Sequence, residues 1–398
     1  MITSVAFALV ERGYDVQIVC SRELHNDASD CLSARDTICG AMVWRLGATR
    51  FGRHNLLGRS IDYCSFHLLA FIWLFRHTQP LDIVIVCTDP PMVSVTAAIP
   101  LRMRKVTMIN WIMDLFPETA LELGMFRRSQ RLGKMAVALR NWSLQTAGVT
   151  VCPTQRMQEY LQQAGLRHPM RVMHHWADGA QIQPVDPVDN DLRARWGLGD
   201  KFVVGYSGNF GRAHDFSTII EAAKRLKHRS DIKFLMIGDG HQLPSVVEAA
   251  RAFSLDNMIF KPLQPAEHLA ESLSVADAHL VSLLPDLEYC IVPSKFYGIL
   301  AAGRPTIFIG DVDGEVPRVL AETGCGRTIP IGAADALAAT IVELQEDREA
   351  LVTMGRAARQ LLVSRYSREN AIDRWAALMT QLDTPITTTP TLAQRSYS

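Results

Sequence analysis

Several features that would place this chain of 398 residues in a familiar class are absent from its sequence. Its eight cysteines are scattered, with neither a Cys-x-x-Cys pair nor a close Cys/His spacing, which argues against a zinc site and against a disulfide framework. The longest apolar run, HLLAFIWLF at residues 67–75, is too short to cross a bilayer, and it predicts a buried helix or, as the alternative, shallow membrane contact. The opening residues are typical of an amphipathic helix rather than a signal peptide, so we expect a cytoplasmic protein.

An overall charge is missing as well, because 41 Lys and Arg residues balance 41 Asp and Glu residues. We therefore expect no nucleic-acid partner. The two halves differ, since residues 1–178 contain 19 basic and 14 acidic side chains and residues 179–398 contain 22 and 27. The basic clusters RMRK (102–105) and RRSQRLGK (127–134) are interpreted either as solvated helix ends or as a surface attracted to an anionic membrane or a phosphorylated acceptor.

What the chain does contain is a series of strand-length apolar runs that alternate with helical patterns. Near-continuous Val/Ile strands separated by helices predict parallel sheets covered on both faces. We predict an α/β fold with two doubly wound Rossmann-like domains facing a cleft. The expected segments are a front domain at 1–178, a linker at 179–200, a back domain at 201–365, a capped amphipathic helix at 366–383 and a disordered tail at 384–398. Front-domain strands are expected at 15–20, 42–46, 82–88, 106–112, 148–153 and 171–176.

The order of elements at the start of the front domain is unusual, because a helical pattern comes before the first strand. The pattern resembles the second half of a βαβ unit whose first strand and glycine loop are missing. A misplaced start codon, a truncated reading frame and a permuted domain are the open explanations. If that strand is absent, its neighbours have an uncovered edge, and we expect a poorly stable front domain.

A glycine-rich turn follows the first back-domain strand, in the segment YSGNFGRAHDF. Gly208 and Gly211 allow backbone N–H groups to approach a ligand at a helix start, and Arg212 adds a positive charge with fork geometry. The spacing is not that of the dinucleotide fingerprint, and Asp239 comes later than that fingerprint requires, which disfavours nicotinamide binding. A purely structural turn is the alternative.

A second motif lies in the segment YCIVPSKFYGILAAGRP, where Ser294 can cap a helix whose first turn contains Lys295. A cation is disfavoured there by the helix dipole, so its presence indicates an anion nearby, the alternative being a solvated lysine. In the front domain, Asp114 follows a strand and could accept a hydrogen bond from a hydroxyl group or cap a helix. His174 and His175 are expected to close the last front-domain strand.

These motifs, in the order SGNFGRAHDF, MIGDG, IFKPLQPAEHL and VPSKFYGILAAGRPTIFIGD, resemble the carboxyl-terminal domain of GT-B glycosyltransferases of family 4. The chain is most similar to the bacterial sugar transferases of colanic-acid, O-antigen and capsule assembly. The segments WIMDLFPETALELGMF and HHWADGAQIQPV resemble the front-domain and hinge motifs of that group. The resemblance also implies that the last helix crosses back to the front domain.

The resemblance implies a nucleoside-diphosphate sugar as substrate, with no other cofactor and no metal. Arg212 and Lys295 would converge on the diphosphate, Asp114 would meet the acceptor, and His175 and Asp178 would belong to the hinge. The implied donor-side positions are Gly208, Asn209, Gly211, His214, Gly238, Asp239, Lys261, Pro262, Leu263, Glu288 and Ser294. Within these, the backbone at Lys261–Leu263 would hold the base and the IGDG loop would form part of the nucleotide pocket.

Some positions depart from the family pattern. Asn209 and His214 stand where most family 4 enzymes have an arginine and a lysine, and Cys290 and Gly298 stand where most have two glutamates. The contact to the ribose is therefore unassigned. The expected function is retaining sugar transfer to a polyprenyl-diphosphate-linked glycan in cell-surface polysaccharide synthesis, with peripheral contact at the inner face of the membrane. The alternatives are a non-catalytic nucleotide-binding relative that scaffolds a partner transferase and a sugar-nucleotide epimerase, for which Glu288 is the available acid or base.

Overall fold

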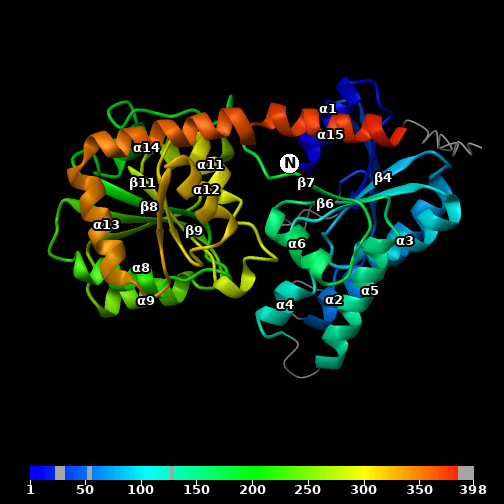
Figure 1. The fold of residues 1–398 in the computed structure, drawn as a ribbon, viewed down its shortest axis with the longest axis horizontal. Helices are drawn as coiled ribbons and strands as arrows, with labels where there is room; N and C mark the ends of the chain where they lie inside the picture. The colour runs from blue at the N-terminus through cyan, green and yellow to red at the C-terminus, as the bar shows by residue number, and fades with distance from the viewer. Residues whose placement is uncertain (23–31, 52–55, 126–129, 384–398) are drawn as a thin grey trace, which may run out of the picture.

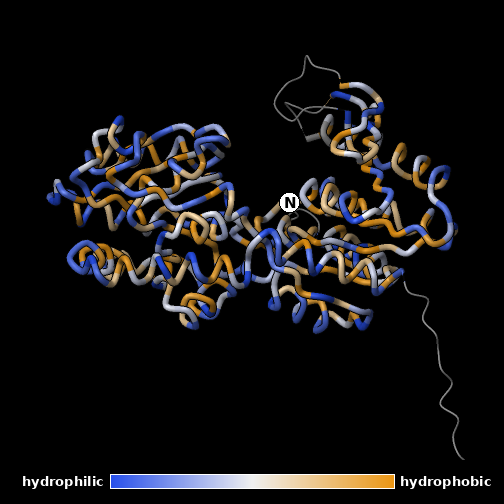
Figure 2. The backbone as a smooth tube through the Cα atoms, turned by 90° about the horizontal axis from the view of Figure 1, so that it is seen from above, coloured by the Kyte–Doolittle hydropathy of each residue, from blue (hydrophilic) through white to orange (hydrophobic). Residues whose placement is uncertain are grey.

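The computed structural model describes residues 1–22, 32–51, 56–125 and 130–383, which form two α/β domains side by side along the long axis (Figures 1 and 2). The predicted α/β class with two domains is confirmed. The tail expected to be disordered (384–398) and the residues 127–129 of the second basic cluster lie outside the described residues. None of the described helices has both the length and the apolar character needed to pass through a membrane.

The back domain is built on one parallel sheet of six strands in the order β10-β9-β8-β11-β12-β13. The chain leaves β8 toward one edge and later returns to its other side at β11, which makes the β8/β11 boundary the switch point where doubly wound sheets bind ligands. The strands are β8 (Phe202–Asn209), β9 (Ile232–Asp239), β10 (Met258–Lys261), β11 (Ala278–Ser282), β12 (Thr306–Ile309) and β13 (Gly326–Ile329).

Helices cover both faces of this sheet, so the central strand β11 is buried at every residue and its neighbour β8 at its first five. Leu300 and Phe308 belong to the core cluster on one face, and Ile219 and Leu337 to the cluster on the other. The helices are α7 (Asp191–Arg195), α8 (Ser217–Arg225), α9 (Leu243–Ala252), η1 (Ala266–His268), α10 (Leu269–Ser274), η2 (Pro285–Leu287), α11 (Lys295–Ala301), α12 (Glu315–Thr323), α13 (Ala334–Glu346), α14 (Arg348–Leu361) and η3 (Leu362–Tyr366).

The front domain contains two sheets, which corrects the expectation of one fully parallel arrangement. β4 (Ile83–Cys87), β5 (Thr107–Trp111), β6 (Val149–Cys152) and β7 (Met170–Val172) form a parallel sheet, and β1 (Gln17–Ser21), β3 (Ala41–Leu46) and β2 (Arg35–Ile38) form the other. The helices are α1 (Ile2–Glu11), α2 (Leu56–His77), α3 (Val93–Arg104), α4 (Glu118–Glu122), α5 (Gln130–Gln145) and α6 (Gln155–Gln163).

Strand β2 was missed from the sequence because its four residues, Arg-Asp-Thr-Ile, are all exposed and show no apolar pattern. It pairs antiparallel with β3 across a two-residue turn at Cys39 and Gly40, whose φ angles are 49° and 80°. Two positive φ angles are the geometry of the tight hairpin turns that match strand twist. The turn, rather than burial, therefore accounts for β2.

β1 and β4 are the edge strands at which the two front sheets are separate from one another. Within the part of the chain that the structure describes, β1 pairs with β3 alone and β4 pairs with β5 alone. Val19 of β1 nevertheless packs in the same apolar cluster as Val84 and Val86 of β4, so the two strands are close neighbours. No residue of β1 is fully buried.

The C-terminal helix α15 (Arg368–Asp383) runs from the back domain onto the front domain (Figure 1). Trp375 lies with its ring centroid 4.5 Å from that of Trp111 in β5, and Arg12 of α1 forms an ion pair of 2.6 Å with Asp373. The front core is thus completed by the last helix, which couples the two domains through one continuous segment.

Candidate active site

The candidate site lies at the carboxyl edge of the back sheet, where the loops after β8, β9, β11 and β12 meet. Because all six strands are parallel, their carboxyl ends share one edge. The turns that the sequence predicts at Gly208–His214 and Gly238–Gly240 follow neighbouring strands, and the ladder places Gly208 opposite Gly238. The structure therefore brings these two predicted segments together.

Close backbone packing explains the glycines of these turns. Gly208 and Gly238 have φ angles of 133° and 150°, and a Cβ atom on Gly238 would overlap the carbonyl oxygen of Gly208. On the opposite side, Phe210 N donates to Asp239 O at 2.8 Å, and Asp239 Oδ1 accepts from Gly240 N at 2.7 Å. The side chain of Asp239 thus fixes its own turn.

We expect Gly238→Ala to lower the free energy of unfolding by about 2–4 kcal/mol, because the new methyl group meets backbone that cannot move aside. Gly199→Ala is the matched control, since nothing lies within 4 Å of its Cβ position and its φ angle is not in the left-handed region. Urea denaturation of both variants checks the prediction. Equal midpoints for the two variants would contradict the packing described here.

Lys295 is the first residue of α11 and lies against the glycine turn. Its Nζ donates to the hydroxyl oxygen of Tyr206 at 2.5 Å and sits 3.8 Å from the centre of that ring, while the Tyr206 hydroxyl donates to Asn209 O at 2.7 Å. A Cβ atom on Gly208 would be 3.4 Å from Lys295 Cε. The ammonium group is therefore held at the carboxyl end of β8, and the alternative of a solvated lysine is wrong.

Burial lowers the pKa of Lys295 to about 7. Among the residues that the structure describes, no carboxylate forms an ion pair with it, so its charge is offset only by a hydroxyl oxygen and the face of a ring. Lys295 is half-buried and so has lost part of its hydration, and a bound anion would offset that loss. The environment of Lys295 thus suits the binding of an anion.

Arg212 contacts a different element from Lys295. Its Nη2 lies 2.7 Å from Nε2 of His241, in the turn after β9, and it lines an open pocket of about 590 Å³ with His241, Gln242 and Glu248. Lys295 does not line this pocket. The structure therefore places both cations beside the glycine turn but does not bring them into one described pocket.

His214 and Gln242 fix the far end of the glycine turn. His214 Nδ1 donates to Ser282 O at 2.5 Å, and Gln242 Nε2 donates to Gly211 O at 2.6 Å and His214 O at 3.0 Å. Burial first, and the nearby Lys295 second, lower the pKa of His214 to about 4, so its ring is neutral at physiological pH. Gln242 was missed from the sequence, since nothing local distinguishes it.

Glu288 supplies a buried carboxyl group at the ends of β11 and β12. Its Oε2 accepts from Glu315 N at 3.4 Å, its Oε1 has no hydrogen-bond partner among the described residues, and burial raises its pKa to about 7. A Cβ atom on Gly314 would collide with this carboxyl group. Ser294 stands at the N-cap of α11, but its side chain forms no cap hydrogen bond, so the predicted capping role is wrong.

The positions expected to hold the base follow β10, the strand at the edge of the sheet beside β9. Lys261 ends this strand with its Nζ 5.4 Å from the centre of the Trp196 ring, and Pro262 O accepts from Gln264 Nε2 at 2.9 Å. Leu263 is exposed. Backbone groups of these three residues and the apolar side chain of Leu263 therefore lie at the carboxyl end of β10, next to β9.

Asp114 lies between β5 and α4 at the carboxyl edge of the front sheet. It lines a small cavity of about 20 Å³ with Asn110 and Arg140 while its side chain stays exposed on the outer side, and desolvation by the surrounding protein raises its pKa to about 6. It does not cap α4, whose N-cap is Pro117. Arg140 forms a buried ion pair with Glu118, while its Nε and Nη1 have no hydrogen-bond partner among the described residues. This pair was missed because its members are far apart in sequence.

The loop around Asp114 touches the back domain directly. Leu115 N donates to Cys290 O at 2.8 Å, and Tyr289 donates its hydroxyl hydrogen to Glu122 Oε1 at 2.5 Å. Arg156 of α6 adds a contact of 3.4 Å to Asp311 and a hydrogen bond to Asp313 O. The edge that holds Asp114 and the loop that holds Glu288 therefore face one another across the domain boundary.

The predicted hinge residues lie beyond the strand expected to contain them. β7 ends at Val172, so His174 and His175 follow it, which corrects the expected strand over 171–176. His175 is buried, neither of its ring nitrogens has a hydrogen-bond partner among the described residues, and burial lowers its pKa to about 4. Asp178 Oδ1 accepts from Ala180 N at 3.0 Å and Gln181 N at 3.1 Å, which fixes the start of the linker.

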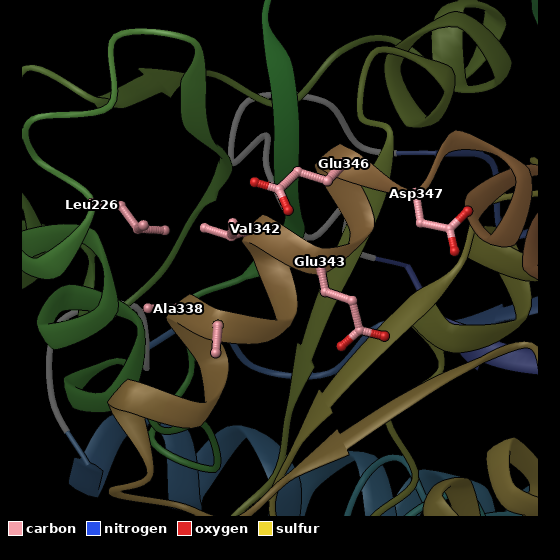
Figure 3. Close-up of a pocket in the computed structure, with 7 residues that line it drawn as sticks. Leu226, Ala338, Val342, Glu343, Glu346 and Asp347 are labelled. Atoms are coloured by element: carbon pink, nitrogen blue, oxygen red, sulfur yellow. The ribbon is translucent and has the colours of Figure 1, made fainter.

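Another depression lies on the back domain between Leu226 and α13, where Glu343, Glu346 and Asp347 gather (Figure 3). Leu226 follows the end of α8, which returns from the carboxyl edge, so this depression lies toward the amino ends of the strands. No group of three or more His, Cys, Asp or Glu side chains able to hold a metal occurs in the described ranges.

Both domains of the chain match known family models. The family model "Glycosyl transferase 4-like domain" matches residues 1–176, and "Glycosyl transferases group 1" matches residues 188–361. The chain is 25% identical over 338 residues to the probable glycosyltransferase WbjE of Pseudomonas aeruginosa, covering 84% of this chain and 83% of that protein. It is 33% identical over 157 residues to the putative colanic acid biosynthesis glycosyl transferase WcaI of Escherichia coli (strain K12), covering 39% and 38%.

Solved structures with the same fold include sucrose-phosphate synthase from Thermosynechococcus elongatus, with a TM-score of 0.75 at 16% identity over 96% of this chain and 92% of that chain. Anabaena HepE in complex with UDP-glucose has a TM-score of 0.67 at 16% identity, over 86% of this chain and 87% of that chain. At these identities the likeness shows the fold alone.

Proposed function

Because this chain belongs to the glycosyltransferases, with a 4-like front domain and a group 1 back domain, we propose that it transfers a sugar from a nucleoside-diphosphate sugar to a lipid-linked glycan with retention of configuration. The glycosyltransferase activity belongs to cell-surface polysaccharide synthesis. The observation that supports the donor most strongly is the half-buried Lys295 beside Gly208 without a carboxylate partner among the described residues. A diphosphate supplies the anion that this position lacks.

In this proposal the back domain binds the donor and stabilises the leaving group. Lys295 donates to the diphosphate, and Arg212 leaves His241 to bring its guanidinium to the same group. Charge grows on the diphosphate as the bond to the sugar breaks, so donors already in place lower the barrier most. The unpartnered Oε1 of Glu288 is suited to accept from a hydroxyl group of the donor.

The front domain orients the acceptor. Asp114 accepts the hydrogen bond of the attacking hydroxyl group, and a diphosphate oxygen of the donor receives the proton when the new glycosidic bond forms on the face that the leaving group occupied. A polyprenyl diphosphate is the lipid carrier that we propose for the glycan, and it places the enzyme at the inner surface of the cell membrane. Side-chain cations supply the positive charge, so we expect no requirement for a divalent metal or another cofactor.

Calorimetric titration with UDP, GDP and ADP tests the donor assignment and names the base. We expect one of the three to bind, with affinity unchanged by EDTA. Transfer to an acceptor glycan, followed by the anomeric coupling constant of the product, then tests retention. Nucleotide binding without product would support a scaffold, and conversion of the free donor without acceptor would support an epimerase. Failure of all three nucleotides to bind would overturn the proposal.

A further inference from the structure

The outward face of helices α2, α3 and α5 is unusually apolar. These helices form one layer on the front domain, in the lower right of Figure 1, and α3 contacts both α2 and α5. Of the 25 large hydrophobic side chains exposed in the described ranges, twelve lie on these three helices and six lie in the whole of residues 179–383. Leu68, Met103 and Met135 are 62%, 63% and 55% exposed. We call this surface the front apolar face.

The core of the front domain does not require these side chains. The inward side of α2 packs Trp73 and Leu74 against Ala98 and Leu101 of α3 and Val86 of β4. A helix with one face in a core normally carries polar residues on the other face. Here the run at 67–75 is apolar on both faces, which corrects the expectation of a simply buried helix: Leu68 and Phe75 point outward. Something other than the fold therefore accounts for the outer residues.

Basic side chains accompany the apolar ones. Arg76, Arg102, Lys105, Arg131 and Lys134 are exposed at or beside the ends of the three helices. Asp62 is the single acidic residue in the sequences of α2, α3 and α5. Trp142 is also exposed, and an amphipathic ring of this kind is enriched where membrane meets water. Apolar groups surrounded by cations and almost free of carboxylates complement an anionic lipid surface.

We propose that the front apolar face docks the protein on an anionic membrane surface, with the side chains of α2, α3 and α5 inserted at the level of the lipid headgroups. This inference rests on the proposed function, because a lipid-linked acceptor is presented at such a surface. Exposed apolar patches of this extent otherwise mark contacts between proteins. The low acid content favours lipid over a second copy of this chain, whose matching face would carry the same positive charge.

Vesicle co-sedimentation without nucleotide tests the docking face separately from transfer. The full chain is expected to bind vesicles of phosphatidylethanolamine and phosphatidylglycerol, to bind phosphatidylcholine vesicles far less, and to lose affinity at high salt, where the screening length falls to about 3 Å. The triple variant Leu68→Glu, Met103→Glu and Met135→Glu is expected to bind these anionic vesicles with an affinity at least about tenfold lower than that of the parent. The matched control, Val188→Glu, Val352→Glu and Val363→Glu, changes three exposed residues of the linker and the back domain and is expected to bind like the parent.

Two further measurements keep the test decisive. Thermal unfolding of both triple variants should match the parent, because all six side chains are exposed, and nucleotide calorimetry of the front variant should be unchanged. The proposal is overturned if the parent does not bind anionic vesicles, or if the triple variant of the front apolar face binds them as well as the parent. It is also overturned if the parent binds anionic and phosphatidylcholine vesicles with equal affinity. A parent dimer in analytical ultracentrifugation that the front variant converts to monomer would assign the face to a second copy instead.

Discussion

Replacement of Lys295 by alanine is expected to lower kcat/KM for sugar transfer by about 10²–10³-fold, which corresponds to roughly 2.7–4 kcal/mol of transition-state stabilisation. The reason is that Nζ of Lys295 is held at Gly208 by Tyr206 and by burial, so its charge needs no rearrangement when the diphosphate leaves. Initial rates with saturating acceptor and varied donor measure the effect.

Lys295→Arg and Tyr206→Phe serve as controls for this prediction. Arginine keeps a charge at any working pH, whereas Tyr206→Phe removes the hydroxyl group that positions the amine and leaves the ring beneath it. Because burial lowers the pKa of Lys295 to about 7, kcat/KM of the parent should fall as pH rises above that value, and the arginine variant should lack this fall. Turnover of Lys295→Ala within a few-fold of the parent would remove Lys295 from the mechanism.

Replacement of Asp114 by asparagine is expected to lower kcat by about 10²-fold while donor affinity stays unchanged. Asparagine fills the same space in the small cavity beside Asn110 and Arg140 but presents only one acceptor oxygen to the acceptor hydroxyl group. A misplaced hydroxyl group reduces the rate of attack without disturbing the back domain. Donor calorimetry and single-turnover transfer separate the two effects.

The pH profile gives Asp114 a second signature. Burial raises the pKa of its carboxyl group to about 6, and the acceptor hydroxyl requires the ionised form, so kcat/KM should fall as pH drops below about 6. Burial raises the pKa of Glu288 to about 7, so its carboxyl group titrates in a similar pH range. The variant Glu288→Gln shows which of the two carboxyl groups causes the fall in rate. An acid limb that persists in Asp114→Asn and disappears in Glu288→Gln would assign the limb to Glu288.

The sequence predicts the back domain better than the front domain, and the difference has a physical origin. Strands β8 and β11 are buried on both faces, so their composition alone indicates them. β2 depends on the turn at Cys39 and Gly40, and the division between β1 and β4 depends on which strands pair. Which strands pair depends on the arrangement of the whole sheet, so the sequences of β1 and β4 do not by themselves show their partners.

The candidate site shows the same contrast. The glycines at 208 and 238 and the lysine at 295 stand out locally, because each is unusual at its position in a strand end or helix start. The partner of Arg212 was not predictable, since His241 belongs to another loop and no pattern links the two. The contact of Leu115 with Cys290 and that of Arg156 with Asp311 depend on how two domains meet.

Linked proton uptake during nucleotide binding tests most directly the claim that Lys295, at the carboxyl edge of the back sheet, binds the diphosphate of the donor. At pH 8, calorimetry of the cognate nucleoside diphosphate in two buffers of different ionisation enthalpy should show uptake of about one proton, because a pKa near 7 is raised by the bound anion. Lys295→Arg should bind with no uptake, since arginine is already charged. Tight binding by the parent with the same enthalpy in both buffers would contradict the account.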